Sequence, residues 1–251
     1  MLEPAEINAR LRMMRKQADP GRRWDQQCEG SAAALVVFVG PSPGTNPSDP
    51  AVRAPRRRNC CRALWNQSFA DPLGWSPGFR ISFAPLVEAL FETNWSRANK
   101  LIARANLDWY GNPEASKVPE QRMLDGAPSV LRLIEDCEPQ LVLPMERRAF
   151  WVLQTAMVKA GWKTAPCDVD RFSVRISRKS KRRHREIFCF RATSPDGRQL
   201  AVIKLPQHPA KMLEADYGTR CGAAVRTASI QIARRLEIDV SVDLPNNSRG
   251  N

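Results

Sequence analysis

Apolar residues along this chain gather into short continuous runs and into longer stretches with helical spacing. Residues 34–39 (ALVVFV) form an uninterrupted apolar run that ends at Gly40, a pattern typical of a buried parallel strand. A second run of this kind lies within PQLVLPM, residues 139–145. Residues 83–93 fit either a helix or a strand. Helices are predicted in residues 3–17, 60–69, 96–105, 119–136, 147–160 and 213–236.

The late part of the chain changes to a two-residue alternation. Residues 171–177 (RFSVRIS) and 186–193 (EIFCFRAT) predict two strands that form a hairpin through the basic turn RKSKRRHR. The turn SPDG then leads into a further strand, RQLAVIKLP. Strands separated by helices favour an α/β fold in three layers, with a central, mostly parallel sheet flanked by helices and a late inserted basic β-hairpin. No repeat or boundary divides residues 1–251, so we expect one domain with a polar tail at 245–251.

The composition is that of a folded protein, with 251 residues of which 43% are hydrophobic and 26% charged. No apolar run approaches the roughly 18 residues that span a bilayer, and the charged start MLEPAEINARLRMMRK lacks the apolar core of a signal peptide. Seven cysteines without a C-x-x-C pair indicate reduced thiols rather than a zinc site. We therefore expect a cytoplasmic protein with no membrane partner, and a monomer.

Positive charge is in large excess, because 39 Lys and Arg face 26 Asp and Glu and give a net charge of +13. The excess is concentrated in residues 53–62 and 171–185, which hold five and eight Lys or Arg and no acid. Solvated loops would account for either run alone. Two such runs in one basic protein favour contact with nucleic-acid phosphates. The expected DNA-binding residues in them are Arg56, Arg57, Arg58, Lys179, Lys181, Arg182 and Arg183.

Of the two histidines, His208 has the more informative position. It lies between two prolines in LAVIKLPQHPAKM, directly after an apolar strand and so at the carboxyl end of that strand. In open α/β sheets, ligands bind at this edge. The first apolar strand is likewise followed by GPSPGTNPSDPAVRAP, a loop with five prolines that is long for a simple connection. Both loops are therefore candidates for the functional site.

Three segments thus follow one another: Gly40-Pro41-Ser42-Pro43-Gly44, then Thr93-Asn94, then His208-Pro209-Ala210-Lys211-Met212. Their order and spacing resemble the uracil-DNA glycosylase superfamily over most of residues 34–236. Members carry G-x-[D/N/E]-P-[Y/G] after the first core strand, a strand-end Asn that reads the flipped base, and H-P-S-x-L or a similar motif after the last core strand. The resemblance implies a monofunctional DNA glycosylase that removes a pyrimidine from double- or single-stranded DNA without a metal or other cofactor.

The resemblance also implies roles for single residues at the base. His208 would donate a hydrogen bond to the pyrimidine O2 as negative charge builds on the leaving base. Asn94 would read the polar edge of the base with its amide, although it also suits the N-cap of a helix that starts at Trp95. Trp65 is a candidate for stacking on the flipped base, together with Phe69 and Trp109.

Other residues of the two motifs would contact the DNA or shape the pocket. Met212 would fill the gap that the flipped base leaves in the stack, or it would begin the core face of the last helix. Lys211 would contact phosphate. The base pocket, or else only a tight turn, would be formed by Gly40, Pro41, Pro43 and Gly44.

Two positions depart from the family pattern. Position 42 is Ser, where members carry an acidic or amide residue that holds the attacking water, so Asn46, Asp49 or backbone carbonyls would assist here. Position 44 is Gly, where the uracil-specific branch has a Tyr that excludes C5-substituted bases. An open C5 side fits modified cytosines, such as glucosylated hydroxymethylcytosine of bacteriophage DNA, and an antiviral defence role. The alternatives are a non-catalytic nucleic-acid-binding protein on the same fold and a plain uracil or mismatch repair glycosylase.

Overall fold

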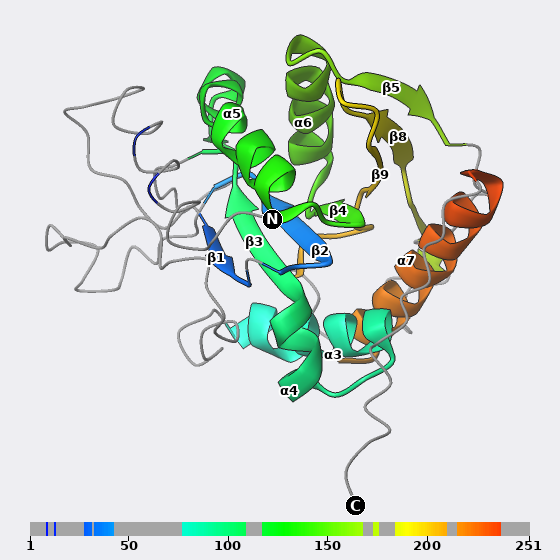
Figure 1. Ribbon diagram of the computed structural model, residues 1–251. Helices are drawn as coiled ribbons and strands as arrows, with labels where there is room; N and C mark the ends of the chain where they lie inside the picture. Colours follow the sequence, from blue (N-terminus) through cyan, green and yellow to red (C-terminus); the bar gives the residue numbers. More distant parts are fainter. Residues whose placement is uncertain are drawn as a thin grey trace, which may run out of the picture.

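The computed structural model of the protein shows a central sheet with helices packed on it (Figure 1). It describes Ala9, Met13 and residues 28–31, 33–42, 77–108, 117–167, 173–175, 184–209 and 215–236. No helix in these segments has the length and the hydropathy needed to cross a membrane.

Seven strands form one mixed sheet in the order β1-β3-β2-β4-β9-β8-β5. Four neighbouring strands in the middle of the sheet run parallel to one another: β3 (Ile102–Asn106), β2 (Val36–Gly40), β4 (Leu141–Pro144) and β9 (Gln199–Ile203). Antiparallel pairing extends the sheet at its two sides through β1 (Cys28–Gly30), β8 (Cys189–Thr193) and β5 (Lys163–Pro166). Because the central strands are parallel, their carboxyl ends meet at one edge of the sheet.

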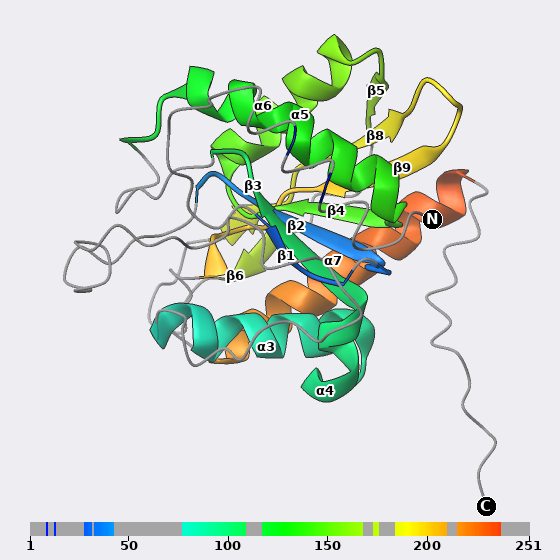
Figure 2. The ribbon, with the colours of Figure 1, turned by 60° about the vertical axis from the view of Figure 1, so that its left-hand side comes forward.

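Helices cover both faces of the sheet, so the predicted three-layer α/β fold is confirmed (Figure 2). One face carries α5 (Glu120–Cys137) and α6 (Arg147–Lys159). The other carries α3 (Pro77–Phe91) and α7 (Ala215–Leu236). A short connection, α4 (Trp95–Ala98) followed by a 3-10 turn, leads from α3 into β3.

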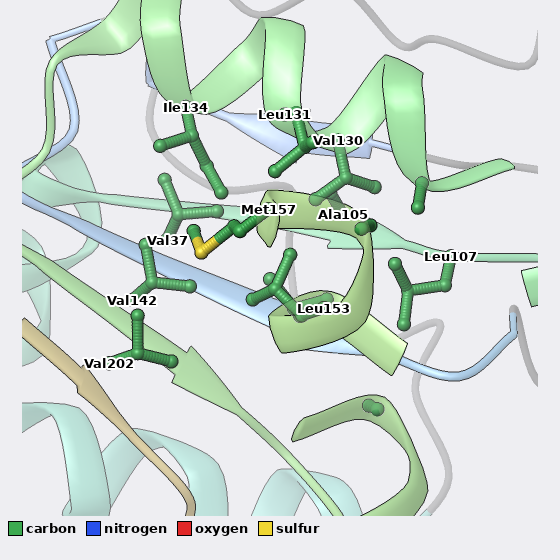
Figure 3. Packing of buried hydrophobic residues seen from close by; sticks show 14 of the residues in the cluster. Val37, Ala105, Leu107, Val130, Leu131, Ile134, Val142, Leu153, Met157 and Val202 are labelled. Carbon is green, nitrogen blue, oxygen red and sulfur yellow. The ribbon is translucent and has the colours of Figure 1, made fainter. Parts of the chain in front are cut away.

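The strands supply two apolar cores, one under each helical layer. Alternate residues such as Val37, Val142 and Val202 pack beneath α5 and α6, against residues that include Leu153 and Met157 (Figure 3). The intervening strand residues face α3 and α7, and they include Phe38, Leu143 and Ile203. Burial on both faces explains why the central strands are continuous apolar runs in the sequence.

Two glycines allow α3 and α7 to pack in direct backbone contact. A Cβ on Gly218 would overlap with the backbone carbonyl oxygen of Ser82, and a Cβ on Gly222 would overlap with that of Leu86. The two glycines are four residues apart and therefore lie on one face of α7. The close contact fixes α3 beneath the sheet next to the helix that follows β9.

Several predicted elements are confirmed, among them the two apolar strands, the helices now seen as α5 and α6, and the last helix. The ambiguous segment 83–93 is mostly helical, as part of α3. The single helix predicted for residues 96–105 is wrong, because α4 and the 3-10 turn end at Leu101 and the chain then forms β3. Ala and Arg favour helices locally, but pairing with β2 and β1 holds this segment as a strand.

The predicted basic hairpin differs from the structure in its pairing. The two short strands β6 (Ser173–Arg175) and β7 (His184–Glu186) pair antiparallel with each other. Residues 186–193 are not one strand, because β8 begins at Cys189 and belongs to the main sheet between β9 and β5. The turn between β6 and β7, the predicted helix at 60–69 and the tail lie outside the described residues, as does the predicted helix at 3–17 except for Ala9 and Met13, which are helical.

Candidate functional site

The carboxyl edge of the central strands collects the polar residues that follow them. Gly40, the last residue of β2, is paired with Asn106, the last residue of β3. The carbonyl of Pro144, which ends β4, accepts a hydrogen bond of 2.9 Å from the N–H of Leu205, just beyond the end of β9. His208 follows three residues later. The first motif, Asn106 and the His208 turn therefore share one edge of the sheet, which is where open α/β sheets bind ligands.

Asn106 is buried, with 3% of its surface exposed, and its side chain lies over Gly40. A Cβ on Gly40 would overlap with the Oδ1 atom of Asn106 and lie 2.9 Å from the Cε atom of Met145. The absence of a side chain at position 40 therefore leaves room for the ends of the Asn106 and Met145 side chains beside the end of β2.

The first motif stays attached to the end of β3 beyond the last regular pair. The N–H groups of Leu107 and Asp108 donate to the carbonyls of Gly40 and Pro41 at 2.9 and 2.8 Å. The Oγ atom of Ser42 is buried and has no hydrogen-bond partner among the described residues. Since a buried unpaired hydroxyl costs about 1–3 kcal/mol, Ser42 is suited to hydrogen-bond a molecule that enters the site.

An ion pair closes the same edge towards α5. Asp108 is 1% exposed, and both of its carboxylate oxygens accept hydrogen bonds from Arg122, at 2.7 to 3.3 Å. The Arg122 side chain is 29% exposed. A bidentate pair of this kind fixes both groups in orientation. The guanidinium of Arg122 offsets the buried negative charge of Asp108, which lies beside the first motif.

The turn that carries His208 is anchored on α3. Ser82, which is fully buried, donates a hydrogen bond of 2.7 Å from its Oγ atom to the carbonyl of Pro209. Pro206 is buried on the other side of the turn, while His208 itself is half-buried. The expectation that His208 follows the last core strand at its carboxyl end is confirmed.

Asn94 does not follow a strand, and the alternative that it is the N-cap of a helix starting at Trp95 is confirmed. Asn94 is exposed and is the N-cap of α4, where its Oδ1 atom accepts hydrogen bonds from the N–H of Arg97 at 3.3 Å and the hydroxyl of Ser96 at 2.6 Å. The helix α4 lies at the amino end of β3 (Figure 2). Its N-cap Asn94 is therefore remote from the carboxyl edge of the sheet. The strand-end amide is Asn106 instead. It was missed because Ile102–Asn106 was taken as helical, although the apolar positions 102, 103 and 105 that precede it were a usable signal.

Many of the predicted site residues fall outside the described segments, and their roles remain predictions. They are Pro43, Gly44, Asn46, Asp49, Arg56, Arg57, Arg58, Trp65, Lys179, Lys181, Arg182, Arg183, Lys211 and Met212. Of the first motif, the structure places Gly40, Pro41 and Ser42 at the edge with Asn106.

The electrostatic setting of this edge favours anions. The helices α5, α6 and α7 all begin on the carboxyl side of the strand that precedes them, so the positive ends of their dipoles lie at this edge. Within the described segments, no three His, Cys, Asp or Glu residues are close enough to hold a metal ion. Burial raises the pKa of the Cys221 thiol on α7 to about 12, so this cysteine is uncharged and unsuited to act as a nucleophile at neutral pH.

Comparison with known proteins adds no assignment to this geometry. No protein-family model matches the sequence. No curated protein matches it significantly either.

Proposed function

We propose that the protein is a monofunctional DNA glycosylase, which flips a pyrimidine out of DNA and hydrolyses its N-glycosidic bond to leave an abasic site. One observation carries the proposal: Gly40-Pro41-Ser42, Asn106 and the His208 turn follow parallel strands to the same edge of the sheet. A strand-end Asn between a Gly-Pro motif and a His-Pro motif is the arrangement expected from the resemblance to the uracil-DNA glycosylase superfamily. The net charge of +13 supports DNA as the partner of a monomeric, cytoplasmic enzyme.

The chemistry of the reaction suits these side chains. Cleavage of the N-glycosidic bond develops positive charge on the sugar and negative charge on the leaving base. His208 donates a hydrogen bond to the pyrimidine O2 and stabilises that negative charge. Asn106, in place of Asn94, reads the polar edge of the base, because an amide both donates and accepts hydrogen bonds.

The attacking water is oriented by hydrogen bonds rather than by a strong base at position 42. The buried Ser42 hydroxyl lies at the end of β2, beside Gly40 and Asn106. A Ser hydroxyl can orient water but does not deprotonate it near neutral pH. Asn46 and Asp49, four and seven residues further along the same loop, supply the remaining hydrogen bonds.

The substrate is a pyrimidine with a substituent at C5. Gly44 stands where the uracil-specific branch has a Tyr, so no ring at that position blocks the C5 side of the base. Modified cytosines of bacteriophage DNA, including glucosylated hydroxymethylcytosine, are substrates of this shape, and their removal would be a defence activity. A plain uracil or mismatch repair glycosylase is the narrower version of the proposal.

The test uses duplexes that contain uracil, a thymine mismatch or a C5-modified cytosine, followed by alkali to cleave abasic sites. We expect strand breaks with at least one of these duplexes. His208→Ala and Asn106→Ala should each lower the rate of base release at least 100-fold, which is the usual cost of removing one group that stabilises charge in the transition state. Asn94→Ala is the matched control, because it removes a cap worth about 1 kcal/mol and leaves base release unchanged. Folded protein that yields no breaks on any duplex overturns the proposal.

Ser42 favours one second candidate, a nucleic-acid-binding protein without catalysis on the same fold. Such a protein would bind DNA with a steep dependence on salt concentration. It would give no product even when protein is in excess over DNA, which separates it from a slow enzyme in a single-turnover experiment.

A further inference from the structure

Two aromatic side chains are exposed at the edge of the sheet that carries the proposed site. Trp151 on α6 is 45% exposed and Phe188, just before β8, is 38% exposed. The ring of Phe150 lies near both, with its centroid 4.9 Å from that of Trp151 and 6.5 Å from that of Phe188. Phe150 is itself buried against Phe190, at 5.1 Å. Trp151 and Phe188 are thus two exposed rings that pack on one buried ring, and they are here called the aromatic patch.

The position of the patch relative to His208 follows from the backbone. The carbonyl of Phe188 accepts a hydrogen bond of 2.8 Å from the N–H of Lys204, which directly follows β9. His208 is four residues further along, so at most about 14 Å of extended chain separates it from Lys204, the residue bonded to Phe188. That distance is about four nucleotides of one B-form strand at roughly 3.4 Å each.

Two cations lie beside the patch, Lys204 near Phe188 and Arg147 near Trp151. Lys204 is 6% exposed, and its Nζ atom lies 5.5 Å from the centre of the Phe188 ring. Arg147 is exposed one turn before Trp151 on α6. Exposed aromatic faces among cations are the combination with which proteins bind single-stranded nucleic acid.

We propose that the aromatic patch stacks on an unpaired base of the DNA strand, within about four nucleotides of the base that enters the site. This inference rests on the proposed function for its partner, DNA. Bases inside a duplex are stacked on both faces and offer neither to the protein, whereas an unpaired base gains about 1–3 kcal/mol from an aromatic ring. The patch thus gives the protein a preference for DNA that is single-stranded or opened beside the target.

The test compares the affinities of variants for a single-stranded oligonucleotide, a duplex of the same sequence and a strand of equal length with abasic sugars in place of bases. We expect Trp151→Ala and Phe188→Ala each to weaken single-strand binding about tenfold, and duplex and abasic-strand binding less than twofold. The dependence of affinity on salt stays unchanged, because no phosphate contact is lost. Val158→Ala, which removes another exposed apolar side chain of α6, is the matched control and binds as wild type.

Three results would overturn the inference. They are unchanged single-strand affinity in both variants, an equal loss on all three ligands, and loss of a protein dimer on mutation, which would make the patch a protein interface. Trp151→Phe keeps a ring and should retain most of the affinity, which separates stacking from a change in folding. If the protein releases a base but the patch variants bind DNA as wild type does, only the stacking inference is wrong. If the patch variants lose single-strand affinity but no substrate yields a free base, only the proposed glycosylase activity is wrong.

Discussion

At the scale of single residues, the site depends on what Gly40 lacks. The position of its absent Cβ is occupied by the amide of Asn106 and the terminal methyl group of Met145. Gly40 ends a regular buried strand, and the backbone there would accept any small residue. A glycine is therefore needed at this position for the close approach of the two side chains and not for the backbone conformation. A substitution at position 40 therefore acts first on the amide that we assign to base reading.

Gly40→Ala is expected to lower base release at least tenfold, because displacement of a positioned group by a few tenths of an ångström to 1 Å is costly in catalysis. The loss of stability should be only about 1–2 kcal/mol, since the obstructing atoms are the ends of side chains. Urea unfolding and single-turnover assays measure the two effects. Val39→Ala on the same strand is the control. This substitution weakens the core beneath α5 and α6, but the folded variant should release the base as fast as wild type. Equal activity of Gly40→Ala and wild type would contradict the assignment of Asn106.

At the scale of the elements, the pair α3 and α7 supports the His208 turn. Ser82 on α3 bonds the carbonyl of Pro209, and its own backbone carbonyl lies against Gly218 of α7. Gly222 repeats this contact one turn later against Leu86. The turn after β9 is thus held by a helix whose position depends on two glycines of its neighbour.

Gly222→Ala should lower the free energy of unfolding by about 2 kcal/mol, because the added Cβ meets a backbone carbonyl that cannot rotate away. The better helix propensity of Ala returns at most about 1 kcal/mol. Thr219→Ala, at an exposed position of the same helix, should change stability by less than about 0.5 kcal/mol. Urea denaturation of both variants decides, and a Gly222→Ala protein as stable as wild type would show that α3 and α7 are not in close contact.

The elements that could be predicted from sequence are those whose local pattern and tertiary setting agree. The strands β2 and β4 are buried on both faces and read as apolar runs, and α5 and α6 show helical spacing. The strand Ile102–Asn106 was missed because its Ala and Arg residues favour a helix, and pairing with two neighbours outweighs that preference. That one error moved the expected base-reading amide from Asn106 to Asn94, whereas His208 was placed correctly because prolines mark the end of its strand.

At the scale of the whole molecule, the topology of the sheet decides where the described site residues and the helix ends lie. The parallel strands direct the first motif, Asn106 and His208 to one side, where three helices present their positive ends. In the sequence, the basic stretch 178–185 begins after β6 and ends within β7, and Phe188 of the aromatic patch follows β7 by two residues. The net charge of +13 agrees with the polyanionic partner that we propose, DNA.

Replacing the six Lys and Arg of residues 178–185 with Gln should weaken DNA binding and reduce its salt dependence. Each lost phosphate contact lowers the slope of log K against log salt by about 0.9, so a reduction of up to about 5 is expected. Base release from saturated complexes should change less than about threefold, since no proposed catalytic group is removed. Lys159→Gln and Lys163→Gln, at exposed positions where α6 ends and β5 begins, should leave the slope unchanged. A slope unaltered by the six changes would remove this stretch from the DNA interface.

The central claim is that this edge of the sheet releases a base from DNA. Mass spectrometry of the free bases released from uracil-containing, mismatched and phage-modified DNA tests it most directly. The proposed site predicts one intact pyrimidine base, set free without strand cleavage by wild type and by Asn94→Ala, but not by His208→Ala or Asn106→Ala proteins of native stability. A base released equally well by the His208→Ala protein, or no base from any of these DNAs with folded wild-type protein, would contradict it.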